Sequence, residues 1–148
     1  MVTVELQNAA PQFSVPTEAQ FQSWAQAIET AENNNQMVAL RIVDEKEMTK
    51  LNTQYRKKTG PTNVLSFPSE LHDDIDIPFM GDVVICAPVV IKEAKQQGKT
   101  EQSHWAHMTV HGILHLQGYD HMNEADAQQM ESIEIQIMRK FGFENPYT

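Results

Sequence analysis

Apolar and polar positions repeat along the chain with two different periods, and each period predicts one kind of element. Apolar side chains occupy every second position of residues 2–6, and residues 37–43 form an apolar, β-branched run. Both patterns are typical of strands. Two further short strands are predicted at residues 64–67 and 83–86. The sequence therefore predicts a sheet of about four strands.

Five other segments have apolar residues three or four positions apart, which is the spacing of one helix face. Capping patterns begin the helices predicted from residues 17, 44 and 123, and Pro88 opens the helix that stops near Gly98. Strands and helices alternate early in the chain, and helices dominate later. We therefore predict one α+β domain that spans residues 1–148.

The remaining helix lies in the segment from His104 to His121, HWAHMTVHGILHLQGYDH, which holds five of the six histidines. On a helix, four of them leave one face within about 80° of one another: His104, His107, His111 and His115. The opposite arc is apolar and carries Ala106, Val110, Ile113, Leu114 and Leu116. The pattern indicates a core helix with one stripe of imidazoles, ended by Gly118.

Three of these histidines have the spacing of metal ligands. His111 and His115 are one helical turn apart, and a turn through Gly118 would bring His121 back as a third ligand. Metzincin proteases share this frame, but they carry a catalytic Glu where this chain has Gly112. Three nitrogen ligands leave one position of a tetrahedral ion open, as in catalytic zinc sites. The spacing predicts one Zn²⁺ per chain, although another transition ion such as Ni²⁺ suits the same ligands.

The stretch HGILHLQGYDH, from His111 to His121, closely resembles the signature of the YbeY family of bacterial metal-dependent endoribonucleases. The likeness extends to HWAHM, QYRKKTGPTNVLSFP, GDVVIC and the ending NPY, and so covers most of the chain. The resemblance implies a small mixed sheet packed with helices, a zincin-like metal helix and a metal site in a groove. It also implies a single-strand-specific endoribonuclease that matures the 3′ end of 16S ribosomal RNA and acts in ribosome quality control. The partners it implies are single-stranded RNA, ribosomal RNA, and the ribosome or small-subunit proteins, with no DNA.

Because Gly112 replaces the protease base, a hydrolase of this kind needs other catalytic groups. Asp120, beside the third predicted ligand, would act as a base or fix the tautomer of a histidine. His107 would be a proton shuttle, a phosphate contact or a hydrogen-bonded residue behind the ligands. Arg56 begins the basic triplet Arg56–Lys58, which by composition alone favours a solvated loop. The resemblance matches Arg56 to an arginine associated with activity in the family, and its guanidinium fork suits a phosphate.

Two alternative functions and the expected location of the protein follow from other features of the sequence. A net charge of −9 argues against binding nucleic acid through a broad basic surface. The metzincin-like spacing allows a zinc-dependent peptidase, and a structural zinc ion would suit a ribosome-associated binding module.

The chain lacks a signal-like N-terminus and any long apolar run, so we expect a cytoplasmic protein that does not bind membranes. Its single cysteine, Cys86, stands in an apolar run and is predicted to be a buried core thiol.

Overall fold

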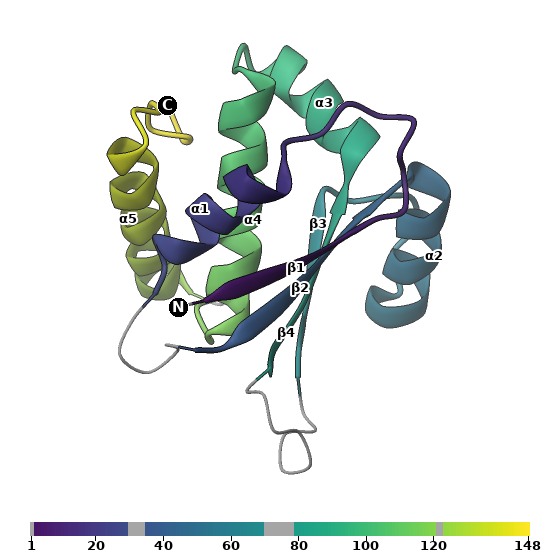
Figure 1. The fold of residues 1–148 in the computed structure, drawn as a ribbon, viewed down its shortest axis with the longest axis horizontal. Coiled ribbons are helices and arrows are strands. Elements are labelled where there is room, and N and C mark those ends of the chain that lie inside the picture. Colours follow the sequence, from purple (N-terminus) through teal and green to yellow (C-terminus); the bar gives the residue numbers. More distant parts are fainter. Residues whose placement is uncertain (1, 30–34, 70–78, 121–122) are drawn as a thin grey trace.

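The computed structural model describes residues 2–29, 35–69, 79–120 and 123–148. These ranges contain four strands and five helices, in the order β1-α1-β2-α2-β3-β4-α3-α4-α5 (Figure 1). The strands are β1 (Thr3–Asn8), β2 (Met37–Val43), β3 (Val64–Pro68) and β4 (Phe79–Cys86). The helices are α1 (Glu18–Gln26), α2 (Glu45–Arg56), α3 (Ala87–Gln96), α4 (Glu101–Leu116) and α5 (Glu124–Lys140).

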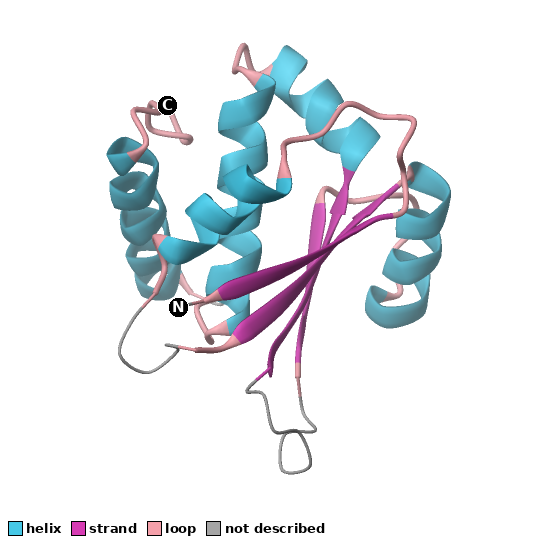
Figure 2. Cartoon of the chain, viewed as in Figure 1, coloured by secondary structure: helices cyan, strands magenta, loops and turns pink. Residues whose placement is uncertain are grey.

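The four strands form one mixed sheet in the order β1-β2-β4-β3. Strands β1, β2 and β4 are parallel, and β3 pairs antiparallel with β4 at one edge. The central strands β2 and β4 are buried along most of their length because helices cover both faces of the sheet (Figure 2). The predicted α+β fold with a four-stranded mixed sheet is confirmed.

Two apolar clusters lie on opposite faces of this sheet. Helix α2 packs on one face, where Met48 contacts a cluster that includes Val84 and Cys86. Helices α1 and α4 pack on the other face, against Val83 and Ile85. Successive residues of a strand point to opposite faces, so β4 serves both clusters.

Cys86 is fully buried in the α2 cluster, as the sequence predicts. Burial raises the pKa of its thiol to about 11. A thiol that stays protonated is a poor nucleophile and a poor metal ligand, so Cys86 has a packing role.

Helix α4 is the centre of the molecule and contacts α1, α3, α5, β3 and β4. Four residues of its predicted apolar arc are buried: Ala106, Val110, Ile113 and Leu114. The helix ends at Leu116, and Gly118 follows with a φ of 97°, a left-handed conformation that glycine adopts without strain. The predicted stop of the histidine helix at this glycine is confirmed.

Gly112 lets α4 approach the sheet closely. A Cβ atom at this position would lie 2.6 Å from Cγ1 of Val83, a distance that real Cβ atoms essentially never show. Ser66 of β3 fixes the same contact, because its hydroxyl donates to the Gly112 carbonyl over 2.8 Å. The glycine that replaces the protease base therefore faces the sheet and has a structural reason to be small.

Within the described ranges, no helix is both long enough and apolar enough to cross a membrane.

Candidate metal centre and the adjoining cavity

The histidine stripe of α4 is divided by burial. His104 and His107 are buried, whereas His111 and His115 are partly exposed and line a cavity. His111 and His115 thus border the cavity, whereas His104 and His107 lie among α3, α5 and the C-terminal residues.

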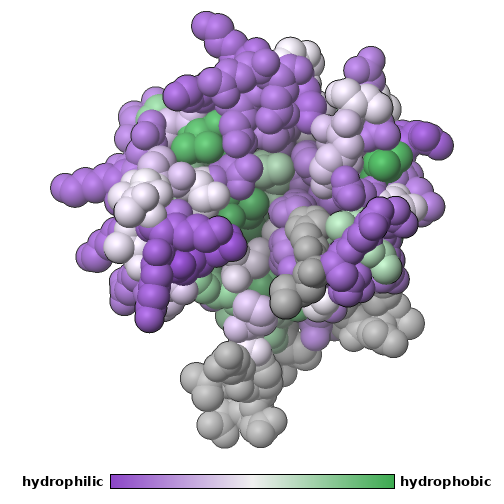
Figure 3. Space-filling view, turned by 180° about the vertical axis from the view of Figure 1, so that it is seen from behind, coloured by the Kyte–Doolittle hydropathy of each residue, from purple (hydrophilic) through white to green (hydrophobic). Residues whose placement is uncertain are grey.

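The cavity has a volume of about 740 Å³ and lies between the end of α2, the edge strand β3 and the last turn of α4. It brings together four of the residues that the sequence singles out: Arg56, His111, His115 and Asp120. The face of the molecule opposite to that of Figure 1 is largely hydrophilic, with apolar side chains in a central hollow (Figure 3). Strand β3 lines the cavity along its whole length.

Arg56 is the last residue of α2, and the turn after it is held in place. Lys57 adopts a left-handed conformation with a φ of 55° and caps the helix through its backbone N–H. The Thr53 hydroxyl donates to the Lys58 carbonyl over 3.1 Å, and the buried Asn52 amide donates to the Gly60 carbonyl over 3.0 Å. Of the basic triplet, only Arg56 lines the cavity.

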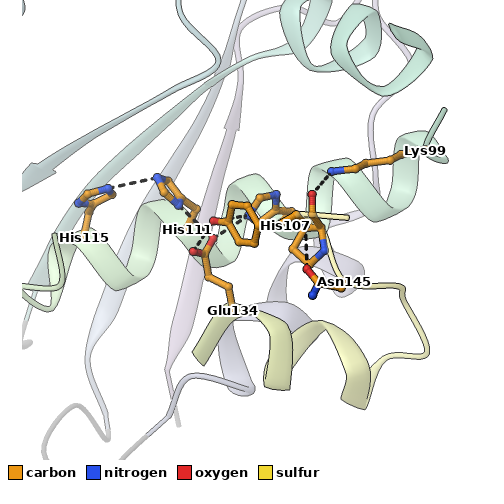
Figure 4. Close-up of polar contacts among 8 residues, drawn as sticks. Lys99, His107, His111, His115, Glu134 and Asn145 are labelled. Carbon is orange, nitrogen blue, oxygen red and sulfur yellow. Dashed lines mark hydrogen bonds and ion pairs between the residues drawn. The ribbon is translucent and has the colours of Figure 1, made fainter. Parts of the chain in front are cut away.

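His107, His111 and Glu134 form a candidate metal-binding group. Each offers a ligand atom, and these atoms lie within 4.8 Å of one another. Glu134, on α5, faces the histidine stripe (Figure 4). Its Oε2 lies 2.7 Å from His107 Nε2 and 3.0 Å from His111 Nδ1. The group therefore joins α4 to α5 through one carboxylate.

Glu134 is a fully buried anion. Burial alone would raise its pKa, but hydrogen bonds from His107 and His111 outweigh this effect and lower the pKa to about 2. Burial also lowers the pKa of His107, so the imidazole is neutral and donates a hydrogen bond from Nε2–H. An ionised carboxylate only accepts, so both ring nitrogens that face it carry hydrogen.

This tautomer decides which nitrogen of His111 can bind a cation. Its Nδ1 faces Glu134 as a donor, so Nε2 is the nitrogen that faces His115 and that a neutral ring offers to a cation. The Nε2 atoms of His111 and His115 lie 3.2 Å apart. Two nitrogens bound at about 2.0 to 2.1 Å to one tetrahedral ion are separated by about 3.3 to 3.4 Å. The separation of the pair is therefore close to that of two ligands of one transition ion.

A second group of hydrogen-bonded side chains holds His104, the first histidine of the stripe. His104 Nε2 lies 2.9 Å from Oε1 of Glu93 on α3, and the Asn63 amide donates to the same oxygen over 3.1 Å. The hydrogen bond with His104 lowers the pKa of Glu93, against the effect of burial. Asn63 also lines the cavity, so this group fixes the start of β3 relative to α3 and α4.

Sequence reasoning missed Glu134 and Tyr147, which complete the buried group. Glu134 occupies a core position in the apolar stripe of α5, between Met130 and Ile137, and a lone carboxylate there is a signal of a buried partner. Tyr147 belongs to the ending NPY that carries part of the family resemblance. Neither residue has a spacing in sequence that points to histidines on another helix.

The other predicted site residues have different positions. His107 is a buried member of the stripe and does not line the cavity, whereas Asp120 is exposed and does. His121, the predicted third ligand, lies outside the described residues. The roles of Arg56, His107 and Asp120, and the ligand set itself, remain predictions.

An α+β domain that brings imidazoles to an open cavity has the architecture of a metal-dependent hydrolase. The sequence model of the family described as "Endoribonuclease YbeY" matches residues 5–142. A protein named "Endoribonuclease YbeY" from Nitrosococcus oceani is 47% identical, with 99% of this chain and 97% of the relative covered. Another with that name from Methylococcus capsulatus is 52% identical over 99% of this chain and 96% of its own length. The chain belongs to the YbeY endoribonuclease family.

The fold has also been seen in a solved structure. The chain is similar to the solution structure of TM1509 from Thermotoga maritima, with a TM-score of 0.61 and 23% sequence identity. The similarity covers 96% of this chain and 92% of the other. At this identity the likeness concerns the fold alone.

Proposed function

We propose that this endoribonuclease cleaves single-stranded RNA with a transition ion, zinc in the first instance, held by His111, His115 and His121. The observation that carries the proposal is the pair of Nε2 atoms 3.2 Å apart in a cavity that Arg56 also lines. The substrate we propose is ribosomal RNA, at the 3′ end of the 16S molecule. Maturation of that end and ribosome quality control would take place in the cytoplasm, with the ribosome or small-subunit proteins as partners.

The cavity side of His111 suits a catalytic ion better than the buried side. Glu134 is fully buried and His107 nearly so, and their atoms are already 2.7 Å apart as hydrogen-bond partners. A catalytic ion needs an open position for water or substrate. We therefore assign Glu134 to the carboxylate that fixes the tautomer of a ligating histidine, an arrangement common at metal sites.

The chain's own residues supply the remaining chemistry. An ion bound here would polarise a phosphoryl oxygen and lower the pKa of bound water. Arg56 would hold the scissile phosphate through two N–H groups and stabilise the charge that develops on it. Asp120 would accept a proton from the attacking group, which in RNA can be the 2′-hydroxyl next to the phosphate. His107 would keep Glu134 in place from the buried side.

A peptidase is the second candidate, because an edge strand lines the cavity and an extended peptide can pair with such an edge. Gly112 opposes it. The proteases' catalytic Glu follows the first ligand, and here that position faces Val83 and Ser66. A glutamate at this position would point into the sheet.

Cleavage assays distinguish these functions. We expect metal-loaded protein to cleave single-stranded RNA, to spare duplex RNA and to leave casein intact. His111→Ala should remove RNA cleavage and most bound metal, because it removes a proposed ligand. Cleavage of RNA that does not depend on His111 or His115 would refute the proposal, and cleavage of casein alone would favour the peptidase.

The carboxylate behind the ligands gives a prediction of its own. Glu134→Gln keeps the size of the side chain but replaces one acceptor by an amide donor, so His111 loses part of its tautomer control. We expect zinc affinity to fall about 10- to 100-fold. Competition with a chromophoric chelator measures the affinity, and circular dichroism checks the fold. An affinity equal to that of the parent would mean that Glu134 has only a packing role.

A further inference from the structure

The hydroxyl of Tyr147 is the third donor to the buried carboxylate. It donates to Oε1 of Glu134 over 2.6 Å, whereas the two histidines donate to Oε2. Its ring lies edge-on to the ring of His107, with 5.3 Å between the centroids. Tyr147 thus reaches Glu134 from the segment after α5, while the residue as a whole is 44% exposed.

A donor on Oε1 restricts how the carboxylate can rotate. The terminal torsion of a glutamate has broad minima, so packing alone holds it weakly. Burial and the hydrogen bond with Glu134 raise the pKa of the Tyr147 hydroxyl, which therefore keeps its proton and remains a donor. With Tyr147 on Oε1, Oε2 stays between the rings of His107 and His111.

Hydrogen bonds add to the burial of Pro146 in holding the segment that carries Tyr147. The Lys99 ammonium, in the connection between α3 and α4, donates to the Pro146 carbonyl (Figure 4). Asn145 Oδ1 accepts from the backbone N–H of Tyr147 over 2.8 Å, and the Thr148 hydroxyl donates to the Asn145 carbonyl over 2.9 Å. The hydroxyl is therefore delivered to Glu134 by a fixed turn.

We infer that Tyr147 is a positioning residue of the metal site: it holds Glu134 so that Glu134 keeps His111 in the tautomer that binds the ion. This inference rests on the proposed ligands. It adds a residue outside the cavity, 36 positions after His111 in the sequence, to the machinery that sets metal affinity.

Metal affinity without RNA tests the inference. We expect Tyr147→Phe, which removes only the hydroxyl, to weaken Co²⁺ binding about 3- to 10-fold, less than Glu134→Gln does. Chelator competition gives the affinity, and the absorption spectrum of bound Co²⁺ reports its ligand geometry. Thr148→Ala changes the same turn without touching Glu134 and should bind Co²⁺ like the parent. Equal affinity of Tyr147→Phe and the parent would overturn the inference.

A double-mutant cycle separates positioning from a general effect on the fold. In a Glu134→Met background, which lacks both carboxylate oxygens, adding Tyr147→Phe should change Co²⁺ affinity less than twofold. The same loss in both backgrounds would overturn the inference, because Tyr147 would then act independently of Glu134. His111→Ala separates the two proposals: if it leaves Co²⁺ affinity unchanged, the ligand set is wrong, whereas a loss there beside an unaffected Tyr147→Phe refutes only the role of Tyr147.

Discussion

Arg56→Ala is expected to lower single-turnover cleavage of single-stranded RNA by about 100- to 1000-fold, on the scale of a lost oxyanion donor. Arg56 lines the cavity at the end of α2, across from His111 and His115. If its guanidinium clamps the scissile phosphate, it contributes most when charge develops there. Metal content and fold should not change, because Arg56 is exposed.

Three variants serve as controls for Arg56. Arg56→Lys should restore only part of the rate, since an ammonium keeps the charge but loses the two-pronged fork. Lys57→Ala and Lys58→Ala, whose side chains do not line the cavity, should weaken RNA binding modestly and flatten its salt dependence. An Arg56→Ala enzyme as fast as its parent would return Arg56 to the solvated loop that composition favours.

Gly112 gives the largest expected effect on stability. Gly112→Ala places a Cβ 2.6 Å from Val83 Cγ1 and 3.2 Å from Val64 Cγ2. Overpacking of this kind costs about 1 to 3 kcal/mol, offset by about 1 kcal/mol from better helix propensity. We expect the free energy of unfolding to fall by up to about 2 kcal/mol. Gly112→Glu, which restores the protease residue, should prevent folding because it buries a charge against the sheet.

Denaturant unfolding of the metal-free protein measures this effect. Val83→Ala removes the atom that the new Cβ would meet, so Gly112→Ala should cost less in that background. Additive effects would mean that the crowding at Val83 is relieved in another way. A folded Gly112→Glu protein with peptidase activity would contradict the structural reason given for this glycine.

Local patterns in the sequence predict much of this structure because they depend on neighbouring residues. Thr17, Asp44 and Asn123 all cap their helices, because each side chain accepts from the backbone N–H three residues on, and Thr17 with Gln20 also forms the reciprocal contact of a capping box. The imidazole face of α4 follows from helical geometry alone. Arg56, singled out by the family resemblance, and Asp120, singled out by its position beside His121, line the same cavity.

Long-range contacts were beyond sequence reasoning. Strand order depends on which strands pair, and no local signal places β4 between β2 and β3. Glu134 meets His111 only because α5 packs beside α4, and Tyr147 arrives through a turn tied to Lys99. The tautomer of His111 is likewise set by a residue 23 positions away, so the choice between its two nitrogens requires the structure.

Successive side chains of β3 point alternately to α4 and to α2, the two helices that border the cavity. Ser66 points to α4 and bonds Gly112, whereas the next residue, Phe67, points to α2 and packs edge-on against Tyr55 at a centroid distance of 5.2 Å. The histidines and Arg56 therefore come from opposite sides of the sheet, at a separation fixed by its thickness. Deleting Leu65 would turn Ser66 and Phe67 to the opposite faces of the sheet and break both contacts at once. The length of this short strand is thus as constrained as the identity of the residues that line the cavity.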